Sequence, residues 1–521
     1  MDERVTLLRG AGLELRLDAD GTVVSASATG TSATPGGPVR WLSGAGSLHL
    51  EGSAGPLVLG APRVRVDDDE VEVERSGGGL RTVVRHGVEQ DWVVRLVLAN
   101  ETDAPLTLTR VHLGWSAAPG AVVTALAAGA EAAYAVQPAD GTGPLLVGRL
   151  RSGAQAGVDA TGFVLAPPVL GPGHRWAVQW RFEVVAEPRS APAGDLPATT
   201  WLDLEQPVVL PAGPDVAVVA DGLATGVVGE DRVEVEAVEP GTYTVELRSA
   251  RGTTAYGLSW APGLDDLLDD AAAALLAGPA TPGGTARLAG PEAGLVVQDA
   301  LARRVLDAEP AADALELLAG RLAEQVDDDP GAGGPATVAL LAREADRTGD
   351  AALLGAAAAG LLALDRAAPG TGLAGTAVVL GHVRSGRPAD ALLAHLGALR
   401  AASSAQAPAG LELTLLLRPR SSQAPLDADL VRALRRLGTV LGAGLPGRVV
   451  PAVPVDRVAH AGVLLGLVDE ATGQRLRLSW GVTAAELAGR CAAQARARAA
   501  DPAEPGVDRA LAWLVLGRPP G

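Results

Sequence analysis

The most site-like run of residues in this sequence is an acidic triplet followed by glycines. Asp327, Asp328 and Asp329 precede Pro330-Gly331-Ala332-Gly333-Gly334, between two predicted helices. Clustered carboxylates beside glycines can hold Ca²⁺, because hard cations prefer several oxygen ligands, or accept hydrogen bonds from a sugar hydroxyl. The spacing matches no EF-hand loop, and solvated acids at a helix junction are the alternative interpretation. We predict that the triplet binds a ligand and that it is not a metal site.

A second group of chemically capable residues lies near the middle of the N-terminal half. His86, Glu89, Asp91 and Trp92 are close in sequence, and a His with nearby carboxylates can perform acid–base chemistry on a sugar ring. Sequence spacing does not establish that geometry, and a hairpin turn is the favoured interpretation. The acidic run at residues 67–70 is likewise predicted to be a charged turn between two strands.

The remaining reactive residues fit no known catalytic spacing. His382, His395 and His460 belong to no HExxH or comparable metal pattern. No serine lies in a G-x-S-x-G elbow, and Gly331–Gly334 lacks the Lys-Ser/Thr of a phosphate loop. Cys491 is the sole cysteine, so neither a disulfide nor a cysteine-based zinc site can form within the chain. We predict a buried thiol, no cofactor and no metal.

The segments around the acidic triplet are predicted to be helical hairpins. In residues 335–366, apolar stripes at helical spacing lie on both sides of a turn at residues 347–350. Gly349 is expected to end the first helix and Asp350 to cap the second. Most of the chain after residue 263 varies this pattern, with roughly ten or eleven helices. Two segments are predicted to interrupt them: LELTLLLRPR near Leu411, and a hairpin turning at residues 471–473.

The N-terminal half has the two-residue period of β-strands instead. In residues 1–190, two alternating runs flank a predicted turn at Asp20-Gly21. A second turn is predicted at residues 100–105, between a strand and its partner. A run that begins at His174 places Trp176, Trp180 and Phe182 on one side of a strand. The period of two indicates core aromatic residues rather than a ligand platform.

These patterns define the expected fold: a multidomain β + α protein with N-terminal antiparallel β-sandwiches followed by an α/α toroid-like domain of helical hairpins. We expect a large β-sandwich over residues 1–190 and a linker over residues 191–200. Residues 201–260 are expected to form a small sandwich or to continue the first, and residues 263–521 the helical-hairpin domain. No fixed repeat length emerges, which argues against a regular solenoid.

Composition limits the class of partner. The formal net charge is −18, which argues against a nucleic-acid backbone or an anionic membrane as the main partner. The N-terminus opens with charged and alternating residues, and no stretch is apolar enough to span a bilayer. We therefore expect a cytoplasmic protein.

The order of a β-sandwich, a connecting segment and about a dozen paired helices resembles the six-hairpin glycosidase-like proteins, in which a galactose-mutarotase-like supersandwich precedes an (α/α)6 toroid. The phrase ADRTGDAALL at residues 345–354 looks like the inter-helix turn of that superfamily. The resemblance implies a carbohydrate-related protein. Its catalytic members use two carboxylic acids above the toroid centre and aromatic side chains that stack on sugars.

The helical half lacks those features. It contains Trp480 and Trp513 but neither Tyr nor Phe, and no Trp-Glu-Glu-like acid motif is present. We therefore predict non-catalytic binding of a glycan or a protein partner, since a fold does not transfer chemistry. One alternative is an active glycoside hydrolase or phosphorylase with an unrecognised carboxylate pair. The other is a helical scaffold for protein–protein interaction.

Overall fold

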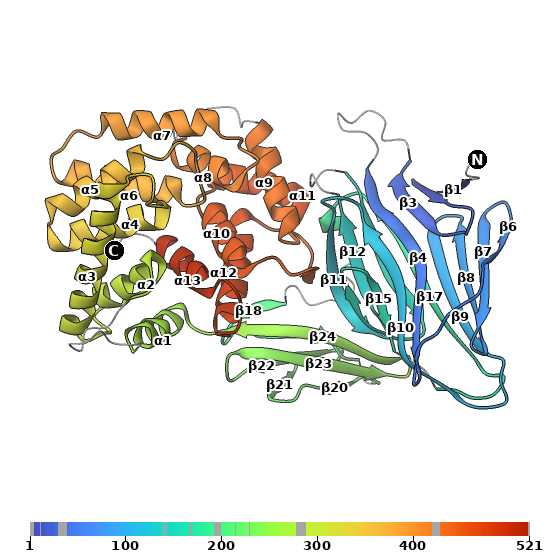
Figure 1. The fold of residues 1–521 in the computed structure, drawn as a ribbon. Coiled ribbons are helices and arrows are strands. Elements are labelled where there is room, and N and C mark those ends of the chain that lie inside the picture. The colour runs from blue at the N-terminus through green and yellow to red at the C-terminus, as the bar shows by residue number, and fades with distance from the viewer. Residues whose placement is uncertain are drawn as a thin grey trace.

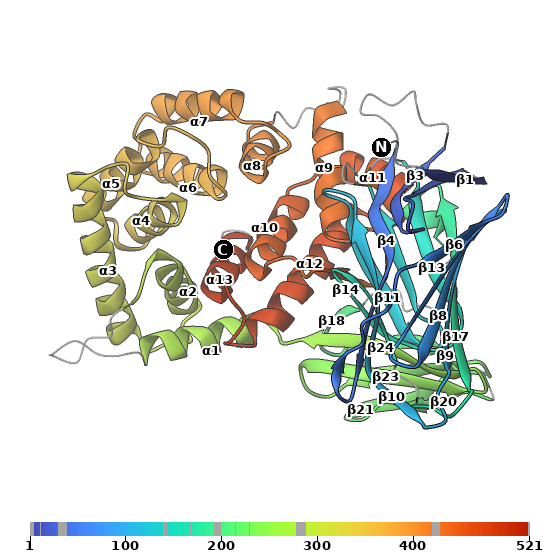
Figure 2. The same ribbon diagram turned by 45° about the vertical axis from the view of Figure 1, so that its right-hand side comes forward.

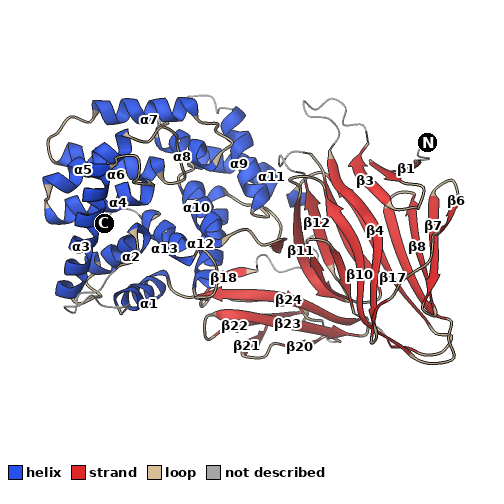
Figure 3. Ribbon diagram, in the orientation of Figure 1, coloured by secondary structure: helices blue, strands red, loops and turns tan. Residues whose placement is uncertain are grey.

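The computed structural model has a β-rich N-terminal part and a helical C-terminal part that lie side by side (Figures 1 and 3). It describes residues 5–10, 12–29, 39–138, 141, 143–166, 169–191, 200–213, 215–228, 230–277, 288–418 and 428–518. This arrangement confirms the predicted β + α multidomain fold. Within these ranges, no helix has the length and apolar character needed to cross a membrane. Most of the expected linker at residues 191–200 lies outside the described residues.

One face of the large sandwich is an antiparallel sheet in the order β1–β2–β3–β4–β10–β15–β14. Two short strands, β5 and β16, extend β4 and β10. The bounds of these strands are β1 Thr6–Gly10, β2 Leu13–Leu17, β3 Val23–Ala28, β4 Arg40–Gly52, β5 Gly55–Pro56, β10 Leu106–Ala117, β14 Gln155–Asp159, β15 Gly162–Leu165 and β16 Val169–Leu170.

The other face is an antiparallel sheet in the order β6–β7–β8–β9–β17–β13–β12–β11–β25. Its last strand, β25, comes from the helical half of the chain. The bounds of these strands are β6 Arg63–Val66, β7 Glu70–Gly77, β8 Leu80–Val88, β9 Trp92–Asn100, β11 Val122–Gly129, β12 Ala133–Gln137, β13 Leu145–Ser152, β17 Arg175–Val185 and β25 Arg448–Val450.

Side-chain alternation explains why these strands bury one face. In β8, every second residue from Leu80 to Val88 is buried, as expected for a strand with one face on a core. Trp180 and Phe182 are buried, and their rings stack against Phe163 and Trp92 respectively. Trp176 is partly buried and packs against the same core. The prediction that the aromatic residues of this strand are core residues is therefore confirmed for Trp180 and Phe182, and Trp176 lies at the edge of the core.

The two predicted turns of this half are present, but one of them joins different partners. Gly21 has a φ of 73° in the turn between β2 and β3, and Asp18 accepts hydrogen bonds from the N–H groups of Asp20 and Thr22. After Asn100, however, the chain crosses to the other sheet, because β9 pairs with β8 and β17 whereas β10 pairs with β4 and β15. The prediction that this turn links two paired strands was wrong, since sequence proximity does not identify hydrogen-bonding partners.

Residues 201–261 form strands with a small core of their own. This core includes Leu210, Val235 and Trp260, yet β24 also pairs with β11 of the large sandwich. The bounds are β18 Trp201–Asp203, β19 Val208–Pro211, β20 Ala217–Val219, β21 Leu223–Val227, β22 Arg232–Ala237, β23 Gly241–Ser249 and β24 Gly252–Ala261. The division into three domains at the predicted boundaries stays a prediction.

The helical half contains thirteen α-helices in the described residues, preceded by the short 3-10 helix η1 (Pro188–Ser190). Their bounds are α1 Leu264–Leu276, α2 Pro291–Ala302, α3 Ala308–Asp328, α4 Pro335–Thr348, α5 Ala351–Leu362, α6 Thr371–Arg384, α7 Asp390–Ala402, α8 Pro408–Leu416, α9 Ala428–Val440, α10 Val455–Gly466, α11 Glu470–Trp480, α12 Ala484–Ala499 and α13 Val507–Leu516.

Six of these helices contact one another in a cycle. The order of contacts is α2–α4–α6–α8–α10–α13, and α13 returns to α2. Figure 2 shows helices α3, α5 and α7 outside this inner group. We call the six helices the inner ring. A cyclic order is what a toroid-like domain requires, while membership of the six-hairpin class stays a prediction.

The predicted hairpin around residue 349 is confirmed, but the two predicted interruptions are helices. Gly349 ends α4 with a φ of 74°, and Asp350 caps α5 by accepting from the N–H of Ala352. LELTLLLRPR instead begins within α8, because a short apolar run in a buried helix has no distinguishing period. The expected hairpin turn at residues 471–473 lies inside α11, where Asp469 caps the helix through the N–H of Thr472.

Strand β25 attaches the inner ring to the large sandwich. It pairs with β11 over residues 448–450. The Arg448 guanidinium lies 4.6 Å above the Trp201 ring and donates to the Ser259 hydroxyl at 2.7 Å. Burial lowers the pKa of this guanidinium. One arginine therefore contacts the small unit from a strand of the helical half.

We expect Arg448→Met to lower the free energy of unfolding by about 1–3 kcal/mol, because it removes a cation–π contact and a charge-assisted hydrogen bond. Denaturant unfolding followed by circular dichroism measures this change. Arg432→Met is the control, since Arg432 forms an exposed pair with Asp429 and its loss should change stability by less than about 0.5 kcal/mol. Equal effects of the two variants would contradict the structural role given to Arg448.

Candidate functional site

A buried carboxylate lies where the inner-ring helices meet. Glu412, on α8, is fully buried. Its carboxylate oxygens accept hydrogen bonds from the N–H of Gly370 at 2.7 Å, the N–H of Leu373 at 2.8 Å and Nε2 of His460 at 2.9 Å. A carboxylate in the interior requires such donors, because burial without them is costly. Glu412 thereby joins α8 to the start of α6 and to the middle of α10.

The contact with Glu412 fixes the orientation of His460. Because the carboxylate acts as the acceptor, Nε2 of His460 is the donor. None of the described residues is hydrogen-bonded to Nδ1. The imidazole stacks on the indole of Trp513 from α13, with ring centroids 4.1 Å apart, and Trp513 is only half-buried. We call Glu412, His460 and Trp513 the ring-centre cluster.

Two glycines allow this close packing. A Cβ at Gly370, which has a φ of 97°, would lie 3.0 Å from the Trp513 ring and 3.1 Å from Cβ of Pro335 at the start of α4. At Gly372, a Cβ would approach the Glu412 carboxylate to 3.0 Å. Side chains at these positions would force the helices apart, so the cluster depends on glycine at the start of α6.

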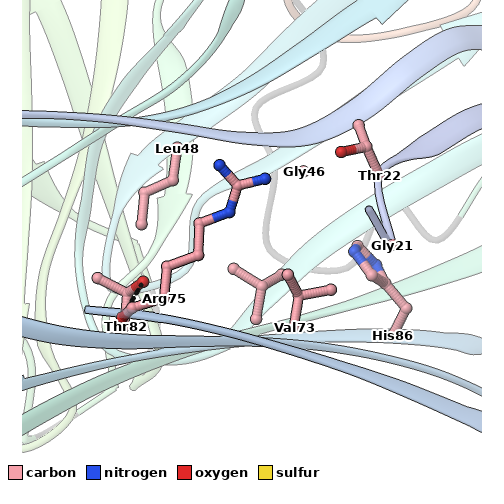
Figure 4. Close-up of a pocket in the computed structure, with 9 residues that line it drawn as sticks. Gly21, Thr22, Gly46, Leu48, Val73, Arg75, Thr82 and His86 are labelled. Atoms are coloured by element: carbon pink, nitrogen blue, oxygen red, sulfur yellow. Dashed lines mark hydrogen bonds between the residues drawn. The ribbon is translucent and has the colours of Figure 1, made fainter. Parts of the chain in front are cut away.

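A second polar group lies inside the large sandwich, in the pocket shown in Figure 4. Arg75 on β7 and Thr82 on β8 are opposite one another in the antiparallel pair, and His86 follows Thr82 on the same inward-facing row. Gly21 and Thr22 from the β2–β3 turn and Gly46 from β4 line the opposite side. We call this space the sandwich pocket.

The His86 side chain is buried in the sandwich pocket, and none of the described residues forms a hydrogen bond with its ring. It is 1% exposed, and neither Nδ1 nor Nε2 has a hydrogen-bond partner among the described residues. Burial lowers the pKa of His86 to about 4, so the imidazole is neutral near pH 7. It also lines a smaller adjoining cavity together with Trp92 and Phe182.

The predicted Asp327–Asp329 triplet is solvent-exposed. Asp327 and Asp328 end α3, and Asp329 accepts from the N–H of Gly331 at 3.1 Å. Pro335, six residues after Asp329, starts α4, and its Cβ would lie 3.1 Å from a Cβ built on Gly370. Among the described residues, no three His, Cys, Asp or Glu side chains are placed to hold a metal ion. A ligand-binding role for the triplet stays a prediction.

The structure separates the other group of acid–base candidates. His86 faces the sandwich interior, whereas Glu89 is exposed in the turn after β8 and Asp91 pairs with Arg181. The hairpin-turn interpretation is therefore confirmed. The acidic residues 67–69 form the exposed turn between β6 and β7, also as predicted. Cys491 is buried, and burial raises its thiol pKa to about 12, which suits a core residue.

Sequence reasoning missed the ring-centre cluster and did not identify the sandwich pocket that His86 lines. Glu412 lies in the segment that was not predicted to be helical, and its partner His460 is 48 residues away. A sequence signal did exist for the sandwich pocket. Thr82 and His86 occupy the same alternating row as Leu80, Val84 and Val88, so two polar side chains interrupt a row expected to be apolar.

Comparisons with known proteins provide structural similarity alone. No protein-family model matches the sequence, and a search of curated proteins gives no match. A solved structure described as "Polysaccharide Lyase BACCELL_00875" is similar with a TM-score of 0.67 at 11% identity, over 93% of this chain and 92% of that chain. This chain therefore shares the fold of a carbohydrate-active enzyme over nearly its whole length.

A second solved structure is described as an active YidC insertase with its first transmembrane domain resolved. It covers 36% of this chain and 40% of that chain, at 13% identity and a TM-score of 0.22. A score this low supports no conclusion about fold.

The depressed pKa of His86 makes a prediction about stability. The unfolded imidazole binds a proton below its ordinary value of 6.5, whereas the folded one does so only below about 4. Stability should therefore fall as the pH decreases from 6.5 to 4, by about 3 kcal/mol from this residue. Unfolding free energies of wild type and His86→Leu, measured across this range, should diverge by that amount. Parallel curves would show that folding does not lower the pKa of His86.

Proposed function

We propose that this protein binds a carbohydrate at the ring-centre cluster. The observation that carries the proposal is the oriented His460 beside the half-buried Trp513, in a fold shared with a polysaccharide lyase. A sugar offers hydroxyl groups that can donate to Nδ1 of His460, and an apolar face that can pack on an indole. Sites of this kind combine aromatic surface with a few fixed polar groups.

Within this proposal, Glu412 is a positioning residue rather than a ligand contact, because its hydrogen bonds already engage both oxygens. The exposed Asp327–Asp329 triplet would add sugar contacts from the neighbouring loop. The proposal also includes membership of the six-hairpin glycosidase-like class, binding without catalysis and a cytoplasmic location. A protein partner in place of the glycan is an alternative within it. The hydrolase alternative gains no support from Glu412, because that reaction needs a pair of available carboxyl groups.

A glycan array followed by titration tests the binding proposal. We expect at least one glycan to bind saturably, and Trp513→Ala and His460→Gln to weaken its binding by about tenfold or more, since each removes a contact of about 1–3 kcal/mol. His382→Gln is the matched control. It replaces a histidine at the opposite end of α6, where the imidazole contacts the carbonyl of Pro388.

The control should bind as wild type does, and all variants should retain the wild-type circular dichroism spectrum. Absence of any glycan response, or equal weakening by His382→Gln, would overturn the proposal. Asp327→Asn combined with Asp329→Asn separately tests whether the triplet contributes.

A second candidate function is β-elimination on a uronic-acid polysaccharide. The Glu412–His460 pair favours it, because a carboxylate that fixes one ring nitrogen leaves the other ready to accept a proton. Nδ1 of His460 would remove the C5 proton next to the sugar carboxylate. The electron pair would form a C4=C5 double bond while the C4–O bond breaks. The departing oxygen would take a proton from solvent water, and the His460 imidazolium would release its proton to solvent.

Ultraviolet absorbance from the new conjugated double bond measures this activity directly on uronic-acid polymers. An active protein should lose about 10²–10⁴-fold in rate on His460→Ala, the range typical of a general base. Binding without new absorbance would leave the non-catalytic proposal in place and exclude the lyase for the polymers used.

A further inference from the structure

The sandwich pocket is built from polar residues that the core does not need. An inward-facing row of a β-sandwich is normally apolar, yet Arg75, Thr82 and His86 all lie on inward rows of β7 and β8. Departures of this kind concentrate at functional sites. The pocket has a volume of about 320 Å³ when its mouth, which is open to solvent, is included, and its enclosed part has room for about one water.

Two of these residues have unused hydrogen-bonding capacity. Both ring nitrogens of the 99%-buried His86 lack hydrogen-bond partners among the described residues. Arg75 is half-buried and lines the pocket, and no described acceptor is hydrogen-bonded to its guanidinium. Figure 4 shows both side chains extending from their sheet toward the opposite side of the pocket, where Thr22 of the β2–β3 turn and Gly46 of β4 lie. A Cβ built on Gly46 would lie 3.1 Å from Nε2 of His86, so this nitrogen faces the β4 side of the pocket.

We propose that the sandwich pocket binds the carboxylate group of a small organic acid. Arg75 supplies the positive charge and a planar pair of donors that matches a carboxylate, and the N–H of the neutral His86 supplies one further donor. A single cation beside a neutral imidazole suits one negative charge better than the higher charge of phosphate or sulfate. The narrow space between two sheets admits a planar group, while the rest of the acid lies toward the open mouth.

Acetate and propionate are the probes, with sodium chloride at matched ionic strength as the reference. At pH 7 we expect a saturable rise in Tm with either carboxylate. Transfer of saturation from the protein to the methyl protons of acetate, observed by NMR, gives an independent readout. Phosphate and sulfate should give no saturable response. Arg75→Met should abolish both signals, and His86→Gln should weaken binding by about tenfold while the protein remains folded.

Arg85→Met is the matched control because Arg85 lies on the outer face of β8, where it pairs with Glu72. This variant removes the same charge from the same pair of strands and should bind acetate as wild type does. If neither carboxylate gives a saturable response up to about 100 mM, any affinity is far weaker than the millimolar range. That result would overturn the proposal, and water would be the occupant of the pocket. Equal losses in Arg75→Met and Arg85→Met, or a stronger response to phosphate, would overturn it as well.

Discussion

The buried carboxylate of Glu412 is the constraint on which the inner ring depends. A charged group with no exposed surface is tolerated only when its oxygens are surrounded by donors, and these donors come from α6 and α10 while Glu412 itself is on α8. The carboxylate thus fixes three helices relative to one another. The same contacts orient His460, whose ring stacks on Trp513, so the packing of the ring and the geometry of the ring-centre cluster depend on one side chain.

Strand β11 joins the three parts of the chain to one another. Its eight residues pair with β12 of the large sandwich, with β24 of the small unit and with β25 of the helical half. Backbone hydrogen bonds are directional, so these pairings restrict how the inner ring can be placed against the sheets. Arg448 adds side-chain contacts at the same joint. The orientation of the helical half is therefore determined largely by strand pairing.

The two polar groups differ in how completely their hydrogen bonds are satisfied. In the ring-centre cluster, the described contacts satisfy both oxygens of the Glu412 carboxylate, and Nδ1 of His460 has no hydrogen-bond partner among the described residues. In the sandwich pocket, the imidazole of His86 is buried without partners and Arg75 has no described acceptor. Unsatisfied buried polar groups are destabilising. His86 is such a group, whereas Arg75 is half-buried.

The sequence by itself determined the elements whose signals are local. We could predict the change from a period of two to a helical period, the Asp20-Gly21 turn and the Gly349-Asp350 junction. Each of these features depends only on neighbouring residues. Glu412 and His460 could not be paired, since they are 48 residues apart and a short apolar run does not distinguish a buried helix from a strand. Only tertiary structure brought these residues together, because packing of the inner helices decides which distant side chains meet.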